Sequence, residues 1–259
     1  MKVRSEINPS YKDRLTQLVD RLKEGKIPTE AVEIYKGRNQ IYTLRISDDL
    51  VVSIKAFRKP SFPNNFIYTN LRASKARRSY LYAEELLARN LPTPAPLAWV
   101  EIKKGGRLHE SYYVCLQSSH ENTLRYWEKW EPELRDEVLS AYSCLLKKIH
   151  DAGILHHDLS PGNVLWTKDS QTGEIRFHLI DLNRMTLFRR PLTLDEAFSN
   201  FRNINLVEEE TVRLGALYGA VIGMNPEEAG TRALRVLRAD QKIKAKRKKL
   251  KHLLEGKKA

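Results

Sequence analysis

The residues most able to do chemistry lie in one short segment, residues 154–166, which reads ILHHDLSPGNVLW. His156, Asp158 and Asn163 fit the pattern H-x-D-L-x-x-x-N, with apolar residues on both sides. An Asp and an Asn at this separation can converge on one small volume, where the Asp accepts a hydroxyl proton and the Asn oxygen binds Mg²⁺. That is the chemistry of phosphoryl transfer. The structural alternative is a tight turn between two strands, for which Ser-Pro-Gly-Asn is also suitable.

A second acid follows in the segment FHLIDLNRM, residues 177–185, where an apolar strand delivers Asp181 into a polar loop. Asp181 comes 18 residues after Asn163, which is where a D-F-G motif places a second metal-binding acid. Leu182 and Asn183 replace Phe and Gly, and Asn tolerates a positive φ better than most residues with a side chain. We therefore expect Asn163 and Asp181 to bind the metal, against the alternative that Asp181 merely ends a strand.

A lysine and an acid complete the pattern. Lys55 sits at the centre of VVSIKAF, residues 51–57, which resembles the V-A-I-K whose lysine binds ATP phosphates. An unpaired buried lysine would be costly, so a partner is expected. Glu84 is preferred, because Leu87 and Ala88 follow it at helical spacing and would turn it towards an apolar face. Glu85 is the alternative, and either acid could instead be a solvated surface group.

A loop that cradles phosphates should join the first two strands, and the sequence offers only Gly37, Arg38 and Asn39 there. It lacks G-x-G-x-x-G. One Gly and one Asn still suffice for a tight hairpin whose backbone N–H groups point at phosphate, and Arg38 would add a charge. These three residues are candidates for binding the nucleotide.

The first half of the chain contains the elements that must position these residues. Apolar residues at helical spacing predict a helix over residues 10–24, and a second helix is expected over 68–90, ended by LPTPAP. Between and after them the period changes to two. Five strands are predicted, at residues 31–36, 40–46, 50–57, 97–102 and 110–117.

The second half is mainly helical. A helix is predicted over 132–152, a strand over 175–180, and further helices over 194–250, including a packed helix at 214–224. The change near residue 118 predicts two lobes. The expected fold is α+β, a bilobal protein-kinase-like fold. Its domains are an N-terminal ATP-binding lobe at 1–117, a C-terminal catalytic lobe at 118–240 and a basic helical tail at 241–259.

Composition and charge narrow the class of protein. The 259 residues are 41% hydrophobic and 30% charged, as in a globular protein. No apolar run reaches the roughly 18 residues of a membrane helix, and the N-terminus shows no secretory signal. Two cysteines in apolar surroundings favour a reducing compartment. The net charge is +13, and residues 241–259 alone contribute +8, from nine Lys or Arg and one Glu.

The segments that carry these features together resemble one known family. YKGRNQIYTLRI, VVSIKAF, LRASKARRSYLYAEELL, LPTPAPLAW, HHDLSPGNVLW and FHLIDLNRM look like the bacterial lipopolysaccharide core kinases, the Kdo/WaaP family. The resemblance runs from about residue 34 to 206. The run SKARRSYLYAEELL and the DLNRM in place of D-F-G are its most specific parts. RIO-type kinases and aminoglycoside phosphotransferases are wider relatives.

The resemblance implies ATP-dependent phosphorylation of a sugar hydroxyl, on Kdo or a heptose, in the inner core of lipopolysaccharide. Such a reaction takes place on the cytoplasmic face of the inner membrane. Carried over by position, Asp158 is the catalytic base, Asn163 and Asp181 hold Mg²⁺, Lys55 binds ATP phosphates and Glu84 positions Lys55. The implied acceptor is the lipid A–core oligosaccharide.

Two basic clusters suit such an acceptor. Residues 72–78, which include Arg72, Lys75, Arg77 and Arg78, and the tail at 241–259 could hold the protein on an anionic membrane surface. The alternative for the tail is a solvated helix end. Nucleic acid is not the expected partner.

Three rival functions stay open. A RIO-like protein kinase would use the basic tail to bind RNA, but no activation loop ending in A-P-E is visible. A small-molecule phosphotransferase shares the same core pattern. A non-catalytic binding protein with this fold is disfavoured, because Lys55, Asp158, Asn163 and Asp181 are all present.

Overall fold

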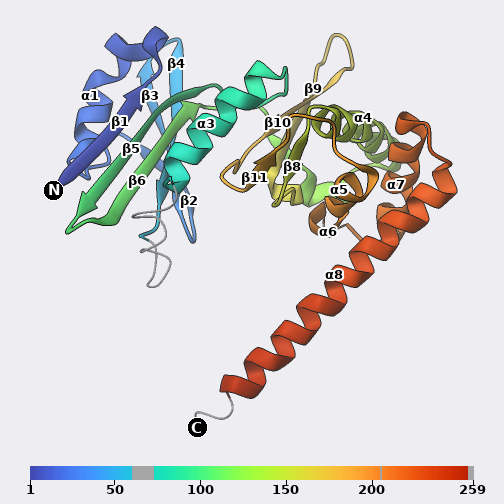
Figure 1. Cartoon of the computed structure of the whole chain (residues 1–259). Coiled ribbons are helices and arrows are strands. Elements are labelled where there is room, and N and C mark those ends of the chain that lie inside the picture. The colour runs from blue at the N-terminus through green and yellow to red at the C-terminus, as the bar shows by residue number, and fades with distance from the viewer. Residues whose placement is uncertain (60–72, 205, 256–259) are drawn as a thin grey trace. The chain divides into compact units, whose positions relative to one another are not determined.

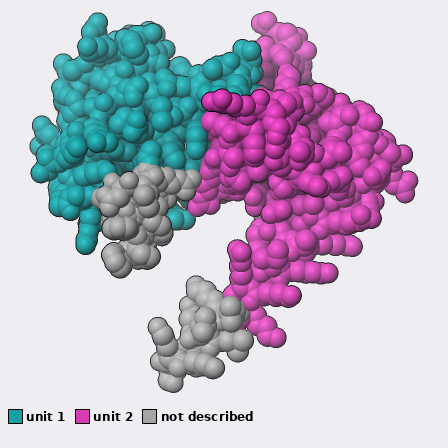
Figure 2. Space-filling view, in the orientation of Figure 1, with its two compact units in different colours: residues 1–121, 177–183 teal, residues 122–176, 184–259 magenta. Residues whose placement is uncertain are grey.

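The computed structural model describes residues 1–59, 73–204 and 206–255, without the side chains of 250–255. The chain forms two compact units (Figure 2). Unit 1 contains Met1–Glu121 and Phe177–Asn183, and unit 2 contains Asn122–Arg176 and Arg184–Ala259. The predicted boundary after residue 117 lies close to Glu121, where the chain first passes from unit 1 to unit 2. The return of 177–183 to unit 1 was not foreseen.

Unit 1 is built on an antiparallel sheet of six strands in the order β1-β5-β6-β4-β3-β2. The strands are β1 (Lys2–Ile7), β2 (Val32–Lys36), β3 (Gln40–Ser47), β4 (Leu50–Phe57), β5 (Pro96–Lys104) and β6 (Arg107–Leu116). The prediction of five strands is wrong, because β1 was missed. Exposed residues alternate with partly buried ones along β1, and this weak one-sided pattern contains too few apolar residues to be recognised.

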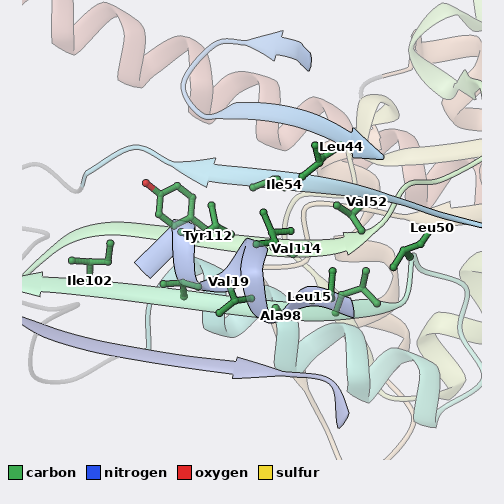
Figure 3. Close-up of a cluster of buried hydrophobic side chains, with 14 residues drawn as sticks. Leu15, Val19, Leu44, Leu50, Val52, Ile54, Ala98, Ile102, Tyr112 and Val114 are labelled. Carbon is green, nitrogen blue, oxygen red and sulfur yellow. The ribbon is translucent and has the colours of Figure 1, made fainter. Parts of the chain in front are cut away.

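One face of the sheet is covered by α1 (Lys12–Lys23), which follows a 3₁₀ turn at Pro9–Tyr11. Leu15 and Val19 of α1 pack against Ala98 and Val114 of the sheet (Figure 3). Val52 and Ile54 of β4 join this core. Because successive residues of a strand point to opposite faces, Lys55 lies on the other face of the sheet. The predicted helix at 10–24 is confirmed.

The second helix of unit 1, α3 (Lys75–Ala88), contacts β5 and β6. Its N-cap is Ser74, whose side chain accepts a hydrogen bond from the Arg77 N–H. The predicted helix began at residue 68, and residues 68–72 lie outside those described. The predicted buried side was wrong: Leu87 and Ala88 are exposed. The buried residues of α3 are Ala76, Arg78, Ser79, Tyr80, Ala83 and Leu86.

Unit 2 is mainly helical (Figure 1). Its helices are α4 (Pro132–Asp151), α5 (Leu194–Ser199), α6 (Phe201–Ile204), α7 (Glu208–Ile222) and α8 (Pro226–Glu255), with 3₁₀ turns at Leu124–Lys129 and Pro161–Asn163. Its strands are β7 (Asn122–Thr123), β8 (Ile154–His156), β9 (Val164–Lys168) and β11 (Met185–Leu187), and β10 (Ile175–Leu179) leads from unit 2 into unit 1. The predicted helices at 132–152 and 194–250 are confirmed.

Small residues allow α7 and α8 to pack closely. A Cβ built at Gly215 would lie 2.7 Å from the Ala233 Cβ, and one at Gly219 would collide with the Ala229 Cβ. Ala229 and Ala233 are fully buried. This explains why the glycine-rich segment 214–224 forms a packed helix, as predicted.

The C-terminal part of α8 differs from its beginning. The helix extends away from the other helices of unit 2 (Figure 1), and residues 241–249 are all exposed. The expected basic tail is thus the continuation of a helix whose first half is packed. In the part of the chain that the structure describes, no helix is both long enough and apolar enough to cross a membrane.

Candidate active site

Unit 1 brings two of the expected residues together. Lys55 lies on β4 opposite Tyr113 of β6, on the face of the sheet that is turned away from α1. Its Nζ lies 2.7 Å from Oδ1 of Asp181, which is 126 residues later in the chain. The two side chains are 16% and 27% exposed. A half-buried lysine therefore has the carboxylate partner that its surroundings demand.

Asp181 itself has a left-handed backbone, with φ of 58°. Asn183, which replaces the glycine of D-F-G, is not among the described residues with a positive φ. Asn183 is buried and its Nδ2 donates a hydrogen bond to Asp181 Oδ1. A left-handed Asp is uncommon and costs backbone energy. The loop therefore orients the Asp181 carboxylate by its own backbone and by the Asn183 amide.

The strand that leads to Asp181 is fixed to the rest of unit 1. The Leu179 N–H donates to the Pro92 carbonyl at 2.9 Å, and the Thr93 hydroxyl donates to the Leu179 carbonyl at 2.8 Å. His120, which follows β6, also contacts this strand: its ring stacks on that of His178, with the ring centres 3.9 Å apart. Burial, and then the neighbouring His120, lower the pKa of His178 to about 4. Sequence analysis missed this stacked pair.

Glu84 and Glu85 have different surroundings. Glu85 forms an ion pair with Arg89, one helical turn later. Glu84 is exposed and lies beside Tyr80, whose pKa is raised by burial and then by this carboxylate. Among the described residues, the ion pair of Lys55 is with Asp181, and none joins Lys55 to either glutamate. The role of Glu84 stays a prediction.

The turn at Gly37, Arg38 and Asn39 connects β2 to β3, and Lys36 pairs with Gln40 across it. The predicted hairpin is confirmed. The Gly37 N–H donates to the Asn39 carbonyl at 3.2 Å, so it is used within the turn. The side chain of Tyr35 fills the space that a Cβ at Gly37 would need, which explains the glycine. The binding of phosphate by this turn stays a prediction.

Unit 2 holds the other two candidates in one loop. Asp158 follows β8, and its Oδ2 lies 3.2 Å from Nη1 of Arg184. Arg184 directly precedes β11, which pairs with β8. Sequence analysis missed Arg184, although it stands in the quoted segment DLNRM. One carboxylate oxygen of Asp158 is therefore occupied by a guanidinium, and the other accepts no hydrogen bond from the described part of the chain.

Asn163 closes the loop from the other side. Its Nδ2 donates to the backbone carbonyl of Asp158 at 2.8 Å. Because the amide nitrogen is used inside the loop, the amide oxygen points away from this contact and remains an acceptor. The alternative of a tight turn is correct for Pro161–Asn163, which forms a 3₁₀ turn. The same turn shapes the loop that contains Asp158.

His156 supports the loop from inside, as its fully buried ring accepts the Asp158 N–H at 3.1 Å. Asn200 donates to the His156 carbonyl at 2.9 Å, and Asn203 donates to the His157 carbonyl at 2.9 Å. These two asparagines, from the region of α5 and α6, connect the helices to the backbone directly before Asp158. Neither of these two contacts was predicted from the sequence.

A buried chain of hydrogen bonds continues behind Asn200. His150, in the last turn of α4, contacts the Asn200 Oδ1 at 3.0 Å and the Tyr218 hydroxyl at 2.8 Å. All three side chains are buried. Burial lowers the pKa of His150 to about 4, so the imidazole is neutral at pH 7. The backbone at Asp158 is therefore held by neutral groups in a dry environment, where hydrogen bonds are strong.

Comparisons with known proteins agree with this arrangement. Residues 55–216 match the model of the lipopolysaccharide kinase (Kdo/WaaP) family, a range that contains Lys55, Asp158, Asn163 and Asp181. No curated protein matches the chain.

Two solved structures share the fold. WaaP, solved in complex with acyl carrier protein, is similar with a TM-score of 0.59 and 16% identity, over 94% of this chain and 98% of that one. The Rio2 kinase of Chaetomium thermophilum, solved as an ADP/Mg²⁺-phosphoaspartate complex, is similar with a TM-score of 0.50 and 13% identity, over 87% of this chain and 75% of that one. Because the family match covers more than half of the chain, the chain belongs to the lipopolysaccharide kinase (Kdo/WaaP) family.

Proposed function

We propose that this protein transfers a phosphoryl group from ATP to a sugar hydroxyl, on Kdo or a heptose, in the inner core of lipopolysaccharide. Family membership supports the class of reaction. The observation that carries the proposal is the environment of Asp158, a carboxylate with one oxygen on Arg184 and a backbone fixed by Asn163 and His156.

Asp158 is the proposed general base. Arg184 holds Oδ2, so Oδ1 remains to accept the proton of the sugar hydroxyl as that oxygen attacks phosphorus. Asn163 and His156 keep the backbone of Asp158 in place during the transfer. Positioning of this kind supplies much of the rate in phosphoryl transfer, because the protein takes little part in covalent chemistry.

The residues present fit a nucleotide with Mg²⁺. Hard cations prefer oxygen ligands, which the Asp181 carboxylate and the Asn163 amide oxygen supply. When bound, Mg²⁺ would neutralise charge on the phosphates. We propose that Lys55 binds phosphate oxygens, and that its present ion pair with Asp181 keeps both side chains oriented for this purpose. Gly37, Arg38 and Asn39 remain the proposed contacts of the nucleotide in the β2–β3 turn.

The acceptor is tested with purified protein, ATP, Mg²⁺ and two lipid acceptors, one ending in Kdo and one carrying a heptose. We expect one acceptor to gain the mass of one phosphate, and tandem mass spectrometry to identify the sugar. A protein extract and an aminoglycoside serve as rival acceptors. Transfer to either of these, with neither lipid modified, would refute the proposal.

We further propose that α8 binds the protein to an anionic membrane surface. Six of the eight residues from Lys242 to Lys249 are Lys or Arg, and all eight are exposed. A lysine or arginine near an anionic membrane contributes about 1 kcal/mol of binding free energy. Of these six cations, Lys244 forms an ion pair, with Asp240, among the described residues.

The other basic cluster is a weaker candidate for this contact. Arg72 lies outside the described residues, Arg78 is 6% exposed, and the guanidinium of Arg77 lies over the Trp99 ring. Lys75 lies near the Phe57 ring. Arg78 is buried and Lys75 and Arg77 are half-buried, whereas residues 242–249 are exposed, so we assign the main membrane contact to α8.

Sedimentation with anionic vesicles tests this assignment. Replacing Lys242, Lys246 and Lys249 with Gln should reduce the bound fraction at physiological salt. The matched control replaces Lys103, Lys104 and Arg107, at the β5–β6 turn, with Gln, and it should bind like the wild type. Equal binding of both variants would remove α8 from the proposal without affecting the proposed reaction.

A further inference from the structure

A second cationic site lies at the outer edge of the sheet in unit 1. A groove of about 560 Å³ is lined by Val3, Arg4 and Ser5 of β1, by Lys23 at the end of α1, by Arg77 of α3 and by Trp99 of β5. β1 is the edge strand, and β5 and β6 separate it from β4, which carries Lys55. The groove is therefore distinct from the residues assigned to the nucleotide.

The charge of this groove is not balanced by its own lining. Its three charged residues are all cations. Lys23 pairs with Asp20 at 2.9 Å, whereas Arg4 and Arg77 form no ion pair within the described ranges. Two acids lie close to this site: the Glu6 Oε2 accepts the Trp99 Nε1–H at 3.0 Å, and Glu101, opposite Arg4 in the strand pair, accepts the Ser74 N–H at 3.0 Å. Two guanidinium groups thus lie at the groove without a carboxylate partner.

Arg77 is held in a fixed orientation. Its guanidinium lies 5.4 Å from the centre of the Trp99 ring, which is a favourable cation–π geometry. Its Nε is buried and has no hydrogen-bond partner among the described residues. Buried donors are nearly always hydrogen-bonded in folded proteins, so a buried Nε–H without an acceptor indicates a missing partner. A guanidinium fixed on an aromatic ring is well suited to bind an oxyanion through two nitrogens.

The position of Arg77 in its helix is consistent with an anion. It lies in the first turn of α3, which contains no acidic residue. The positive end of a helix dipole disfavours cations and favours anions there. An anion bound beside Arg77 would offset its charge, next to a helix start that Ser74 already caps.

We propose that this groove binds a phosphate monoester. Arg77 would supply two donors from its fork, and Arg4, on the same face of the sheet as Trp99, would supply further charge to the remaining oxygens. Lys23 lies at the end of α1, which covers the opposite face, and adds positive charge at the edge of the groove. A phosphate dianion balances these cations better than a single carboxylate does. The proposal does not depend on the reaction assigned to Asp158.

Isothermal titration with glucose 6-phosphate tests the proposal, with glucose as the uncharged control. The full chain is kept saturated with Mg²⁺ and a non-hydrolysable ATP analogue, so that binding at Lys55 does not contribute. Wild-type protein should bind glucose 6-phosphate and not glucose. Arg77→Gln should weaken the binding of glucose 6-phosphate about tenfold, the loss expected for charge-assisted hydrogen bonds. The affinity of Arg77→Lys should lie between those of the wild type and Arg77→Gln.

The matched control is Arg45→Gln, which removes an exposed arginine from β3 of the same sheet and should bind like the wild type. If Arg77→Gln does not fold by circular dichroism, the exposed Arg4→Gln carries the test and should also weaken binding. The proposal is overturned if wild-type protein binds neither glucose 6-phosphate nor vesicles that contain phosphatidic acid. It is also overturned if Arg45→Gln loses as much binding as Arg77→Gln.

The source of the phosphate is distinguished by a second probe. Vesicles of phosphatidylcholine with and without phosphatidic acid are sedimented with wild type, Arg77→Gln and Arg45→Gln. Loss of phosphatidic acid binding that is specific to Arg77→Gln, without glucose 6-phosphate binding, assigns a lipid phosphate. Binding of glucose 6-phosphate assigns a soluble ligand. Either result supports the site.

Discussion

The two groups of candidate residues are held in opposite ways. In unit 1, Lys55 and Asp181 are held by an ion pair between partly exposed side chains that are far apart in the sequence. In unit 2, Asp158 is held mainly through its backbone, by His156 and Asn163, with a buried neutral network behind them. One group relies on charge, and the other on hydrogen bonds in a dry interior.

This difference matches the two tasks. A group that binds a charged ligand must exchange one ion pair for another, so partial exposure and mutual neutralisation suit Lys55 and Asp181. A general base must keep its position within a fraction of an ångström, which a buried network provides. The predictions below test this contrast, from the largest expected effect to the smallest.

The largest effect is expected for Asp158→Asn. Loss of a general base should lower kcat by about 10³-fold. Its exposed ion pair with Arg184 contributes less than about 1 kcal/mol, so the denaturant midpoint should change little. Asp195→Asn, at a highly exposed acid of the same unit, is the control for kinetic assays. A variant with more than a tenth of wild-type turnover would show that Asp158 is not the base.

Lys55→Met should lower kcat/KM for ATP by about 10²-fold, since it removes a charge from the transferred phosphates. It also removes the lysine partner of the partly buried Asp181 carboxylate, which should reduce the free energy of unfolding. The double variant Lys55→Met, Asp181→Asn should recover stability and not activity, because both charges are then removed and Asn tolerates the left-handed backbone of residue 181. Lys36→Met, at an exposed lysine of β2, is the control. Recovery of activity in the double variant would contradict the role of this pair.

His150→Gln should affect turnover rather than nucleotide binding. Weakening the network behind Asn200 should lower kcat about tenfold and leave KM for ATP unchanged, as expected for one buried hydrogen bond. Steady-state kinetics measure both constants. His157→Gln, at an exposed histidine of the same loop, should leave the network intact. A rise in KM alone would place His150 outside the network that supports Asp158.

The pH dependence of stability follows from His150 and His178. Burial lowers both folded-state pKa values to about 4, below the ordinary value of 6.5. Between these values the unfolded chain binds protons that the folded chain does not, so stability should fall as the pH falls from 6.5 towards 4. Denaturation at pH 7 and pH 5 should show this slope. It should be smaller in His150→Gln, and an unchanged slope would mean that His150 does not titrate as inferred.

The smallest effect is expected for Glu84→Gln. If Glu84 takes over Lys55 when Asp181 binds metal, its loss should lower kcat/KM for ATP about fivefold, the contribution of a partly exposed ion pair. Glu85→Gln is the matched control, since Glu85 already pairs with Arg89. Indistinguishable kinetics of the two variants would remove Glu84 from the site.

Much of the fold was predictable because its signals are local. Strands β2 to β6 alternate or run apolar between turn residues, and α1 and α4 show clear helical spacing. β1 was missed because its partner, β5, lies about 95 residues away and half of its own six residues are charged. The buried side of α3 was misjudged because Leu87 is apolar yet exposed, and the sequence does not show where a helix ends its contact with a sheet.

The sequence by itself determined the residue types and spacing of Lys55, Asp158, Asn163 and Asp181, since a motif is a property of the chain. Only the tertiary structure revealed their partners. The Lys55–Asp181 pair, the Arg184 contact and the chain from Tyr218 through His150 and Asn200 join residues that are distant in sequence. Hydrogen bonds and ion pairs depend on distances of a few ångströms, and those distances are set by how sheets and helices pack.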